Sequence, residues 1–112
     1  MNTAAASSQA LRGVDFIDLG ASSGNSMQWA SKAFGGEGLG IDLSAEKVAA
    51  AERQGLRMMR ADARNIDLPS NAVRYCVLMD FLEHLPAAED AEAVIETAFR
   101  LAREFVFIAL PN

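Results

Sequence analysis

The segment from Phe16 to Gly24 has the residue types of a ligand-binding turn. Its sequence is Phe-Ile-Asp-Leu-Gly-Ala-Ser-Ser-Gly, an apolar run that is interrupted by Asp18 and followed by small residues. Small residues let the backbone turn tightly, and a helix that starts directly after the turn points its free N–H groups at a bound ligand. The positive end of the helix dipole favours an anionic group at the same place. The pattern therefore predicts a binding turn between a strand and a helix.

A second acidic residue stands where it could bind a sugar. Asp42 ends the apolar run Leu39-Gly40-Ile41, eighteen residues after Gly24. A carboxylate at the end of the second strand of such a unit can accept hydrogen bonds from ribose hydroxyls. Together with the turn, Asp42 predicts a nucleotide or nucleoside site. The alternative for Asp42 is a solvated residue that caps the helix starting at Ser44.

Strands and helices alternate along the chain, and their order fixes where these residues meet. Hydrophobic periodicity and breaker residues predict strands over 14–19, 39–43, 56–60, 74–79 and 104–110, and helices over 24–34, 45–54 and from Pro86 onward. This alternation calls for a mostly parallel, doubly wound α/β sheet, whose ligands bind beyond the carboxyl ends of the strands. Four acids fall at or just past those predicted ends: Asp18, Asp42, Asp62 and Asp80.

The composition fits one soluble globular domain and argues against several other classes. The chain has 112 residues, a formal net charge of −5 and a single cysteine. We therefore expect one domain over residues 1–112, with no disulfide, secretory signal, membrane span or metal site. The acidic balance argues against a nucleic-acid partner, which would need a basic surface. A cytoplasmic location is the simplest expectation.

These motifs resemble those of the class I S-adenosylmethionine-dependent methyltransferases. The matching residues are the turn over 14–24, Asp42, the pair Asp62-Ala63 and the segment 80–86. The resemblance runs from about residue 14 to residue 112 and implies a Rossmann-like sheet with strand order 3-2-1-4-5. It lacks strands 6 and 7 of that fold, so we expect a C-terminally truncated domain. Ser22 departs from the motif, because the family usually has its middle glycine there.

The resemblance also implies a ligand and a set of residues that bind it. S-adenosylmethionine would be the methyl donor, and its methyl group would pass to an acceptor by direct displacement. Asp18 would bind the ammonium group of this ligand, amides around 21–23 its carboxylate, Asp42 its ribose and Asp62 its adenine amino group; an Asx turn is the alternative for Asp62. The full set implied for cofactor binding is Asp18, Gly20, Ala21, Ser22, Gly24, Asp42, Leu43, Asp62, Ala63, Asp80 and Phe81.

His84 is the only histidine and the one candidate for a catalytic role. In the proteins that the chain resembles, the Glu-His pair after the fourth strand lies near the cofactor and the acceptor pocket. Histidine titrates near neutral pH, which suits a general base. The alternative is a histidine on the rim that is hydrogen-bonded to its own loop, because methyl transfer can need positioning alone. A small molecule is the default acceptor, and the oligomeric state stays open.

Other functions fit parts of the sequence. Residues 20–24 also match G-x-S-x-G, the nucleophile elbow of α/β-hydrolases, but only thirteen residues precede Val14 and a hydrolase gives no role to Asp42 or Asp62. A nicotinamide-binding domain needs the wider G-x-G-x-x-G turn, which the chain matches poorly. A non-catalytic or truncated cofactor-binding module is the main alternative, and Ser22 and the missing last strands favour it.

Overall fold

The structure is a computed structural model that describes residues 9–110. None of the helices in this range is long and apolar enough to cross a membrane. The elements, in chain order, are β1 (Phe16–Leu19), α2 (Asn25–Phe34), β2 (Gly38–Asp42), α3 (Ala45–Arg53), β3 (Met58–Arg60), β4 (Val73–Met79), the short 3-10 helix η1 (Leu82–His84), α4 (Ala88–Leu101) and β5 (Ala102–Ala109).

The five strands form one parallel sheet in the order β3-β2-β1-β4-β5, which confirms the predicted α/β fold and strand order. In the sheet, Phe16 of β1 lies opposite Gly38 of β2 on one side and Tyr75 of β4 on the other. The chain runs outward from β1 to β3 and then returns past β1 to β4 and β5. The order of the strands therefore reverses between β1 and β4. In open α/β sheets, ligands bind at the carboxyl ends of the strands at this reversal.

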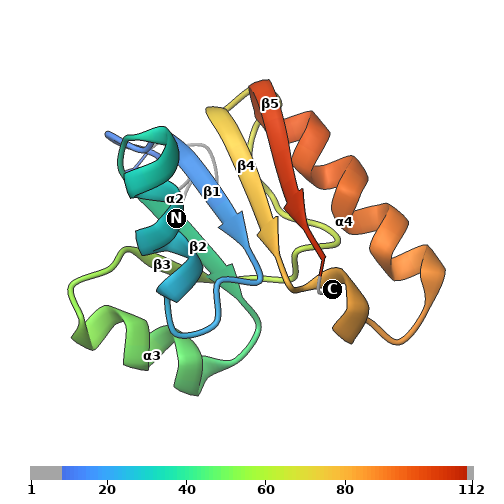
Figure 1. Cartoon of the computed structure of the whole chain (residues 1–112), viewed down its shortest axis with the longest axis horizontal. Helices are drawn as coiled ribbons and strands as arrows, with labels where there is room; N and C mark the ends of the chain where they lie inside the picture. The colour runs from blue at the N-terminus through green and yellow to red at the C-terminus, as the bar shows by residue number, and fades with distance from the viewer. Residues whose placement is uncertain (1–8, 111–112) are drawn as a thin grey trace.

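Helices cover both faces of the sheet, with α2 and α3 on one side and α4 on the other (Figure 1). On the α2 face, the fully buried side chains of Phe16, Tyr75 and Val77 pack with Ala30. On the α4 face, Val94, Ala98 and Leu101 pack against a larger apolar cluster that includes Ile17, Leu19, Cys76 and Leu78. Successive side chains of a strand point to opposite faces, so Asp18 lies on the same face as Phe16.

The close packing of α2 depends on a glycine in β2. A Cβ atom at Gly40 would lie 2.5 Å from the Sδ atoms of both Met27 and Met58 and 2.8 Å from the Cβ of Ala21. Met27 is buried on α2, so a larger residue in place of Gly40 would displace the side chains of Met27 and Met58. This glycine therefore leaves the space that the two methionine side chains fill beside β2.

Most predicted ends of helices and strands are confirmed within one or two residues. Gly24 and Gly35 flank α2, and the Ser44 hydroxyl accepts a hydrogen bond from the Lys47 N–H at 3.3 Å as the N-cap of α3. β1 and β3 begin two residues later than predicted, and β4 begins one residue earlier. Leu43 lies just beyond β2 rather than inside it.

The C-terminal part of the chain contains one element that was not predicted, η1, and two elements, α4 and β5, whose starts differ from the prediction. α4 begins at Ala88 instead of Pro86, because Leu85 before the proline and Ala87 after it are both extended. η1 lies in the segment between β4 and α4, where no helix was predicted. β5 follows α4 without a loop. Its pairing with β4 skips a residue, since Val73 lies opposite Ala102 but Tyr75 lies opposite Phe105. Such a bulge breaks the regular pattern on which the sequence-based boundary depended.

Candidate functional site

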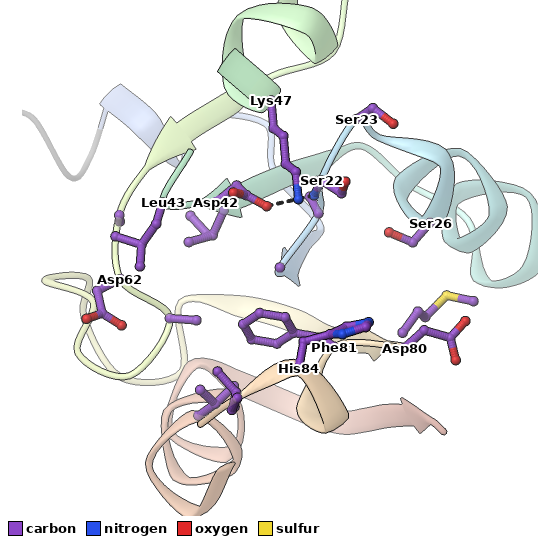
Figure 2. A pocket seen from close by; sticks show the side chains of 18 of the residues that line it. Ser22, Ser23, Ser26, Asp42, Leu43, Lys47, Asp62, Asp80, Phe81 and His84 are labelled. Carbon is purple, nitrogen blue, oxygen red and sulfur yellow. Dashed lines mark hydrogen bonds between the residues drawn. The ribbon is translucent and has the colours of Figure 1, made fainter. Parts of the chain in front are cut away.

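A cavity of about 780 Å³ lies beyond the carboxyl ends of β1 to β4. Ten of the predicted site residues line it: Gly20, Ala21, Ser22, Asp42, Leu43, Asp62, Ala63, Asp80, Phe81 and His84. Figure 2 shows Asp62 at one end of this cavity and Asp80 at the other, with Asp42 and Ser22 between them. The remaining two predicted residues, Asp18 and Gly24, do not line the cavity. The hollow is therefore elongated, and acidic side chains are distributed along its length.

The turn after β1 is held against two neighbouring segments. The N–H groups of Gly20 and Ala21 both donate to the Ile41 carbonyl at 2.9 Å. Gly20 has a φ of 77°, and a Cβ atom there would lie 2.4 Å from the Phe81 ring. The Phe81 ring therefore covers bare backbone, and only glycine leaves room for it. Ser22 also has a positive φ, of 53°, which explains why glycine is usual at this position in similar proteins.

These hydrogen bonds change one expectation about the turn. The N–H of Ala21 donates to Ile41, and the N–H of Ser22 donates to the Asp42 Oδ2 at 3.0 Å. Both of these N–H groups, which were predicted to bind a ligand carboxylate, therefore already have partners within the fold. Of the predicted amides, only the N–H of Ser23 has no hydrogen bond within the described range. The first turn of α2 supplies further free N–H groups next to it.

The side chain of Asp42 is fixed by hydrogen bonds from two backbone N–H groups, one before it and one after it in the sequence. Its Oδ2 accepts the Ser22 N–H at 3.0 Å, and its Oδ1 accepts the Ser44 N–H at 2.9 Å. The alternative role, in which Asp42 organises the start of α3, is therefore present in the structure. It does not exclude the binding role, because each carboxylate oxygen has a further lone pair and the side chain lines the cavity. Lys47 extends from α3 toward Asp42 and Ser22 (Figure 2).

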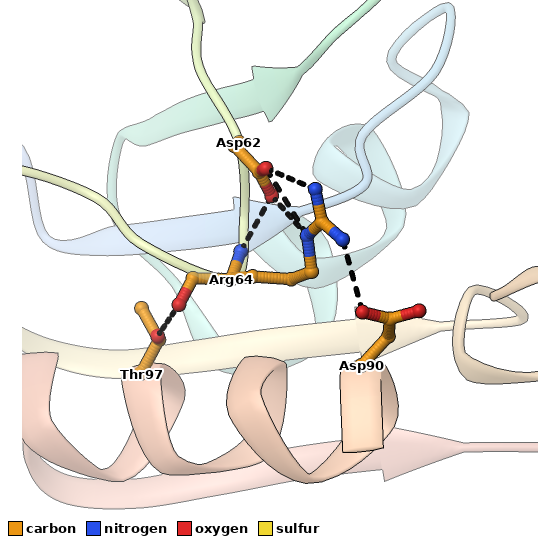
Figure 3. A network of polar contacts seen from close by, with 4 residues as sticks. All are labelled: Asp62, Arg64, Asp90 and Thr97. Carbon is orange, nitrogen blue, oxygen red and sulfur yellow. Dashed lines mark hydrogen bonds and ion pairs between the residues drawn. The ribbon is translucent and has the colours of Figure 1, made fainter. Parts of the chain in front are cut away.

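Asp62 belongs to a polar network that reaches helix α4 (Figure 3). Its Oδ1 accepts the Arg64 N–H at 2.9 Å, which is the predicted Asx turn, and its Oδ2 lies 2.6 Å from the Arg64 Nη2. Arg64 also contacts Asp90 of α4 at 2.9 Å, and its carbonyl accepts from the Thr97 hydroxyl at 3.2 Å. The hydrogen bond from the Arg64 side chain lowers the pKa of Asp62 below its usual value. Asp62 is therefore ionised and fixed at the edge of the cavity.

Asp18 lies behind the cavity, and Ser26 lies between the two. Asp18 is fully buried, and its Oδ2 accepts a short hydrogen bond from the Ser26 hydroxyl. Its other oxygen, Oδ1, has no hydrogen-bond partner in the described range. Burial, which outweighs the hydrogen bond from Ser26, raises the pKa of Asp18 from 3.8 to about 7. Ser26 itself lines the cavity.

The end of the cavity near β4 brings together Trp29, Met79, Asp80 and His84. Asp80 has a φ of 53° directly after β4, so the chain turns sharply there and leads into η1. His84 closes η1 and lines the cavity, but no described residue makes a hydrogen bond with its ring. The alternative of a histidine bonded to its loop is therefore not seen. Trp29 packs against Phe34 and Phe107, yet 43% of its surface stays exposed at the cavity wall.

Several residues that line the cavity were not assigned to the site from the sequence, among them Ser26, Trp29, Lys47 and Arg64. Ser26 and Lys47 lie in the first turns of α2 and α3, which point toward the carboxyl ends of the strands. The sequence carried that signal, because a residue one or two positions into such a helix lies near the turn that precedes it. Arg64 had a weaker signal, its spacing of two residues from Asp62.

The residues present fit a nucleoside with a charged amino-acid tail. Asp62, Asp42 and the Asp18–Ser26 pair follow one another along the cavity, Gly20 leaves bare backbone beside Phe81, and the buried Oδ1 of Asp18 lacks a partner. No group of three or more potential metal-binding side chains occurs within residues 9–110. Ser22, the nucleophile of the hydrolase alternative, makes no hydrogen bond with His84.

Comparisons with known proteins identify one family model and several structures with a similar fold. A family model described as a methyltransferase domain matches residues 16–104. The search of curated proteins found no match. Among solved structures, an S-adenosylmethionine-dependent methyltransferase from Methanosarcina mazei has a TM-score of 0.70 at 22% identity, over 80% of this chain and 47% of that one.

Two further solved structures are similar and hold ligands. Phosphoethanolamine N-methyltransferase 2 from Haemonchus contortus, in complex with phosphomonomethylethanolamine and S-adenosylhomocysteine, has a TM-score of 0.73 at 22% identity, over 86% of this chain and 24% of that one. Geranyl diphosphate methyltransferase in complex with S-adenosylmethionine has a TM-score of 0.69 at 19% identity, over 88% of this chain and 44% of that one. The chain thus spans less than half the length of these three proteins. Because the family model covers most of the chain and the sheet has the expected strand order, the chain belongs to the methyltransferase domain family and has the Rossmann-like fold of class I S-adenosylmethionine-dependent methyltransferases.

Proposed function

We propose that this chain binds S-adenosylmethionine along the cavity and presents its methyl group to a small-molecule acceptor. One observation carries the proposal: Asp62, Asp42 and Ser26 line a single elongated cavity at the carboxyl ends of the strands. This order suits adenine, ribose and an amino-acid tail in turn. The structures that hold this methyl donor or its product share the fold, which supports the assignment.

Each residue has a defined part in this proposal. Asp42, fixed by two backbone N–H groups, accepts hydrogen bonds from the ribose hydroxyls. Asp62 accepts from the adenine amino group beside Ala63, and Phe81 packs over the turn at Gly20. The free N–H of Ser23 and the first turn of α2 bind the carboxylate of the tail. When bound, S-adenosylmethionine supplies an electrophilic methyl group on its sulfonium.

The acceptor binds at the end of the cavity near β4 in this proposal. Trp29, Met79 and Asp80 form that wall, and His84 stands beside them as a general base for an acceptor that must lose a proton. A small molecule suits a cavity of about 780 Å³. The net charge of −5 supports a partner other than nucleic acid. The proposal includes a cytoplasmic location, since the only cysteine is buried and free.

Calorimetric titration with S-adenosylhomocysteine and with NAD tests the binding claim. We expect the wild-type chain to bind the first ligand and not the second. Asp42→Ala should weaken binding about tenfold or more, because a hydrogen bond to a charged group contributes roughly 1.5–3 kcal/mol. Asp15→Ala is the matched control: Asp15 also accepts a backbone N–H, from Glu37 at 2.9 Å, but it precedes β1 at the opposite end of the strand. Equal affinity of the Asp42 and Asp15 variants would contradict the proposal.

A second candidate function is a cofactor-binding module without turnover. It is favoured by His84, whose ring no described residue holds in one orientation. A panel of small amines, alcohols and thiols, incubated with labelled S-adenosylmethionine, separates the two. Transfer to any acceptor that His84→Ala slows supports the enzyme. Binding without transfer to any acceptor supports the module.

A further inference from the structure

The hydrogen bond between Ser26 and Asp18 has a direction that limits what else Ser26 can bind. A serine hydroxyl has one proton, and that of Ser26 is donated to the Asp18 Oδ2. The oxygen of Ser26 can therefore only accept hydrogen bonds from other groups. Figure 2 shows this hydroxyl directed into the cavity, in the half that also contains Asp80. A ligand group at this point must therefore be a donor.

When Asp18 is ionised, no cation in the described part of the protein balances its charge. The ion pairs within residues 9–110 involve Arg64 and Arg74, and neither contacts Asp18. One of its carboxylate oxygens is buried and has no partner, which is costly for an ionised group. The nearby charged group that acts on it is Asp42, a second acid. A cation bound in front of Ser26 would lower the cost of this buried charge.

We propose that Ser26 is the residue that contacts the primary ammonium of the ligand's amino-acid tail, and that Asp18 is a positioning residue acting through it. This assignment rests on the proposed function and changes the part that Asp18 plays in it. Asp18 holds the hydroxyl of Ser26 in the orientation that accepts from the ammonium, and its negative charge attracts the cation across that hydroxyl. The site thereby selects a donor group with a positive charge over an uncharged tail.

Two ligands that differ in one group test this assignment. S-adenosylhomocysteine carries the ammonium, whereas 5′-S-(3-carboxypropyl)-5′-thioadenosine is the same molecule with hydrogen in place of the amino group. Calorimetry should show that the wild-type chain prefers the first ligand by roughly tenfold or more. In Ser26→Ala the preference should fall to near one, with the affinity for the deamino ligand unchanged. Asp18→Asn should lose most of the preference too, because Asn can accept from Ser26 but carries no charge.

Three control variants distinguish direct contact between Ser26 and the ammonium from a purely structural role of Ser26. Ser26→Thr keeps the hydroxyl and should keep the preference within about threefold of the wild-type value. Ser31→Ala removes a hydroxyl from the same helix, one that donates to the Gly36 carbonyl outside the cavity, and should change neither affinity. The double variant Ser26→Ala with Asp18→Asn should lose no more preference than Ser26→Ala alone, because the two residues act as a unit.

The outcomes distinguish this assignment from the proposed function. If the wild-type chain binds neither ligand, both the proposed function and the role of Ser26 are overturned. If it binds S-adenosylhomocysteine and Ser26→Ala retains the preference, only the role of Ser26 is overturned. If Ser26→Ala weakens both ligands equally, Ser26 is structural and does not contact the ammonium. Thermal unfolding of each variant shows whether it is folded. If Ser26→Ala is not folded, the ligand preferences of Ser26→Thr and Asp18→Asn test the role of Ser26 instead.

Discussion

At the scale of single residues, the burial of Asp18 opposes its ionisation, although its proposed role uses the charged form. It lies in the central strand with no exposed surface, and burial raises its pKa to about 7. A carboxyl whose pKa is higher in the folded than in the unfolded state binds its proton more tightly when folded. Its effect on the free energy of unfolding is therefore most favourable at low pH. That stability is lost as the pH rises from about 4 to about 7.

Asp18→Asn should therefore stabilise the chain, and more so at high pH. The rise of the Asp18 pKa from 3.8 to about 7 corresponds to a cost on the order of 4 kcal/mol above pH 7, which asparagine avoids. We expect the difference in unfolding free energy between variant and wild type to grow by about 2–3 kcal/mol between pH 5 and pH 8. Urea unfolding at four pH values measures it, and the other carboxylates cancel in the difference. A difference independent of pH would contradict the raised pKa.

At the scale of elements, the turn after β1 and the segment after β4 support one another. The Phe81 ring packs where a side chain on Gly20 would lie, and Phe81 itself leads into η1. The binding turn is therefore held by a segment about sixty residues further along the chain. Ser22, with its positive φ, sits in the middle of the same turn and is held by Asp42.

Gly20→Ala should disturb both segments at once. The new Cβ would meet the Phe81 ring at 2.4 Å, and the φ of 77° disfavours alanine. We expect a loss of about 2–3 kcal/mol in unfolding free energy and weaker binding of S-adenosylhomocysteine. Adding Phe81→Ala removes the clash, so the double variant should be more stable than the sum of the single effects predicts. Additive effects in urea unfolding would mean that the two residues are not in contact.

At the scale of the whole molecule, the cavity joins loops from four strands. Its walls follow β1, β2, β3 and β4, so a ligand there contacts parts of the sheet that are distant in sequence. The edge strand β5 contributes no residue to the cavity and exposes Phe105 and Ile108. Ligand binding should therefore stabilise the folded sheet as one unit rather than a single loop.

S-adenosylhomocysteine at a hundred times its Kd should raise the free energy of unfolding by about 2.7 kcal/mol. For a chain of this size, that corresponds to a rise in Tm of roughly 10 °C. Methionine and adenosine, each carrying one half of the ligand, should raise the Tm less at the same concentration. Differential scanning fluorimetry measures all three. An unchanged Tm at every ligand concentration would contradict binding in the cavity.

The sequence was most informative where local rules decide the structure. The parallel sheet followed from the alternation of elements, and its strand order followed from the family resemblance. Ser44 and Gly35 marked helix ends because capping depends on neighbouring residues only. The acids at the strand ends were found because parallel strands end on one edge of the sheet. The start of β5 was misjudged because its bulge depends on pairing with β4, a contact between residues distant in sequence.

The sequence by itself indicated the family, the parallel sheet and the edge of the sheet along which Asp42, Asp62 and Asp80 lie. Only the tertiary structure decided which groups are free to bind a ligand. It showed that the N–H groups of Ala21 and Ser22 are used within the fold, and that Ser26 stands between Asp18 and the cavity. The reason is physical: residue types and spacing fix which hydrogen-bonding groups exist, whereas three-dimensional packing decides which of them already have partners.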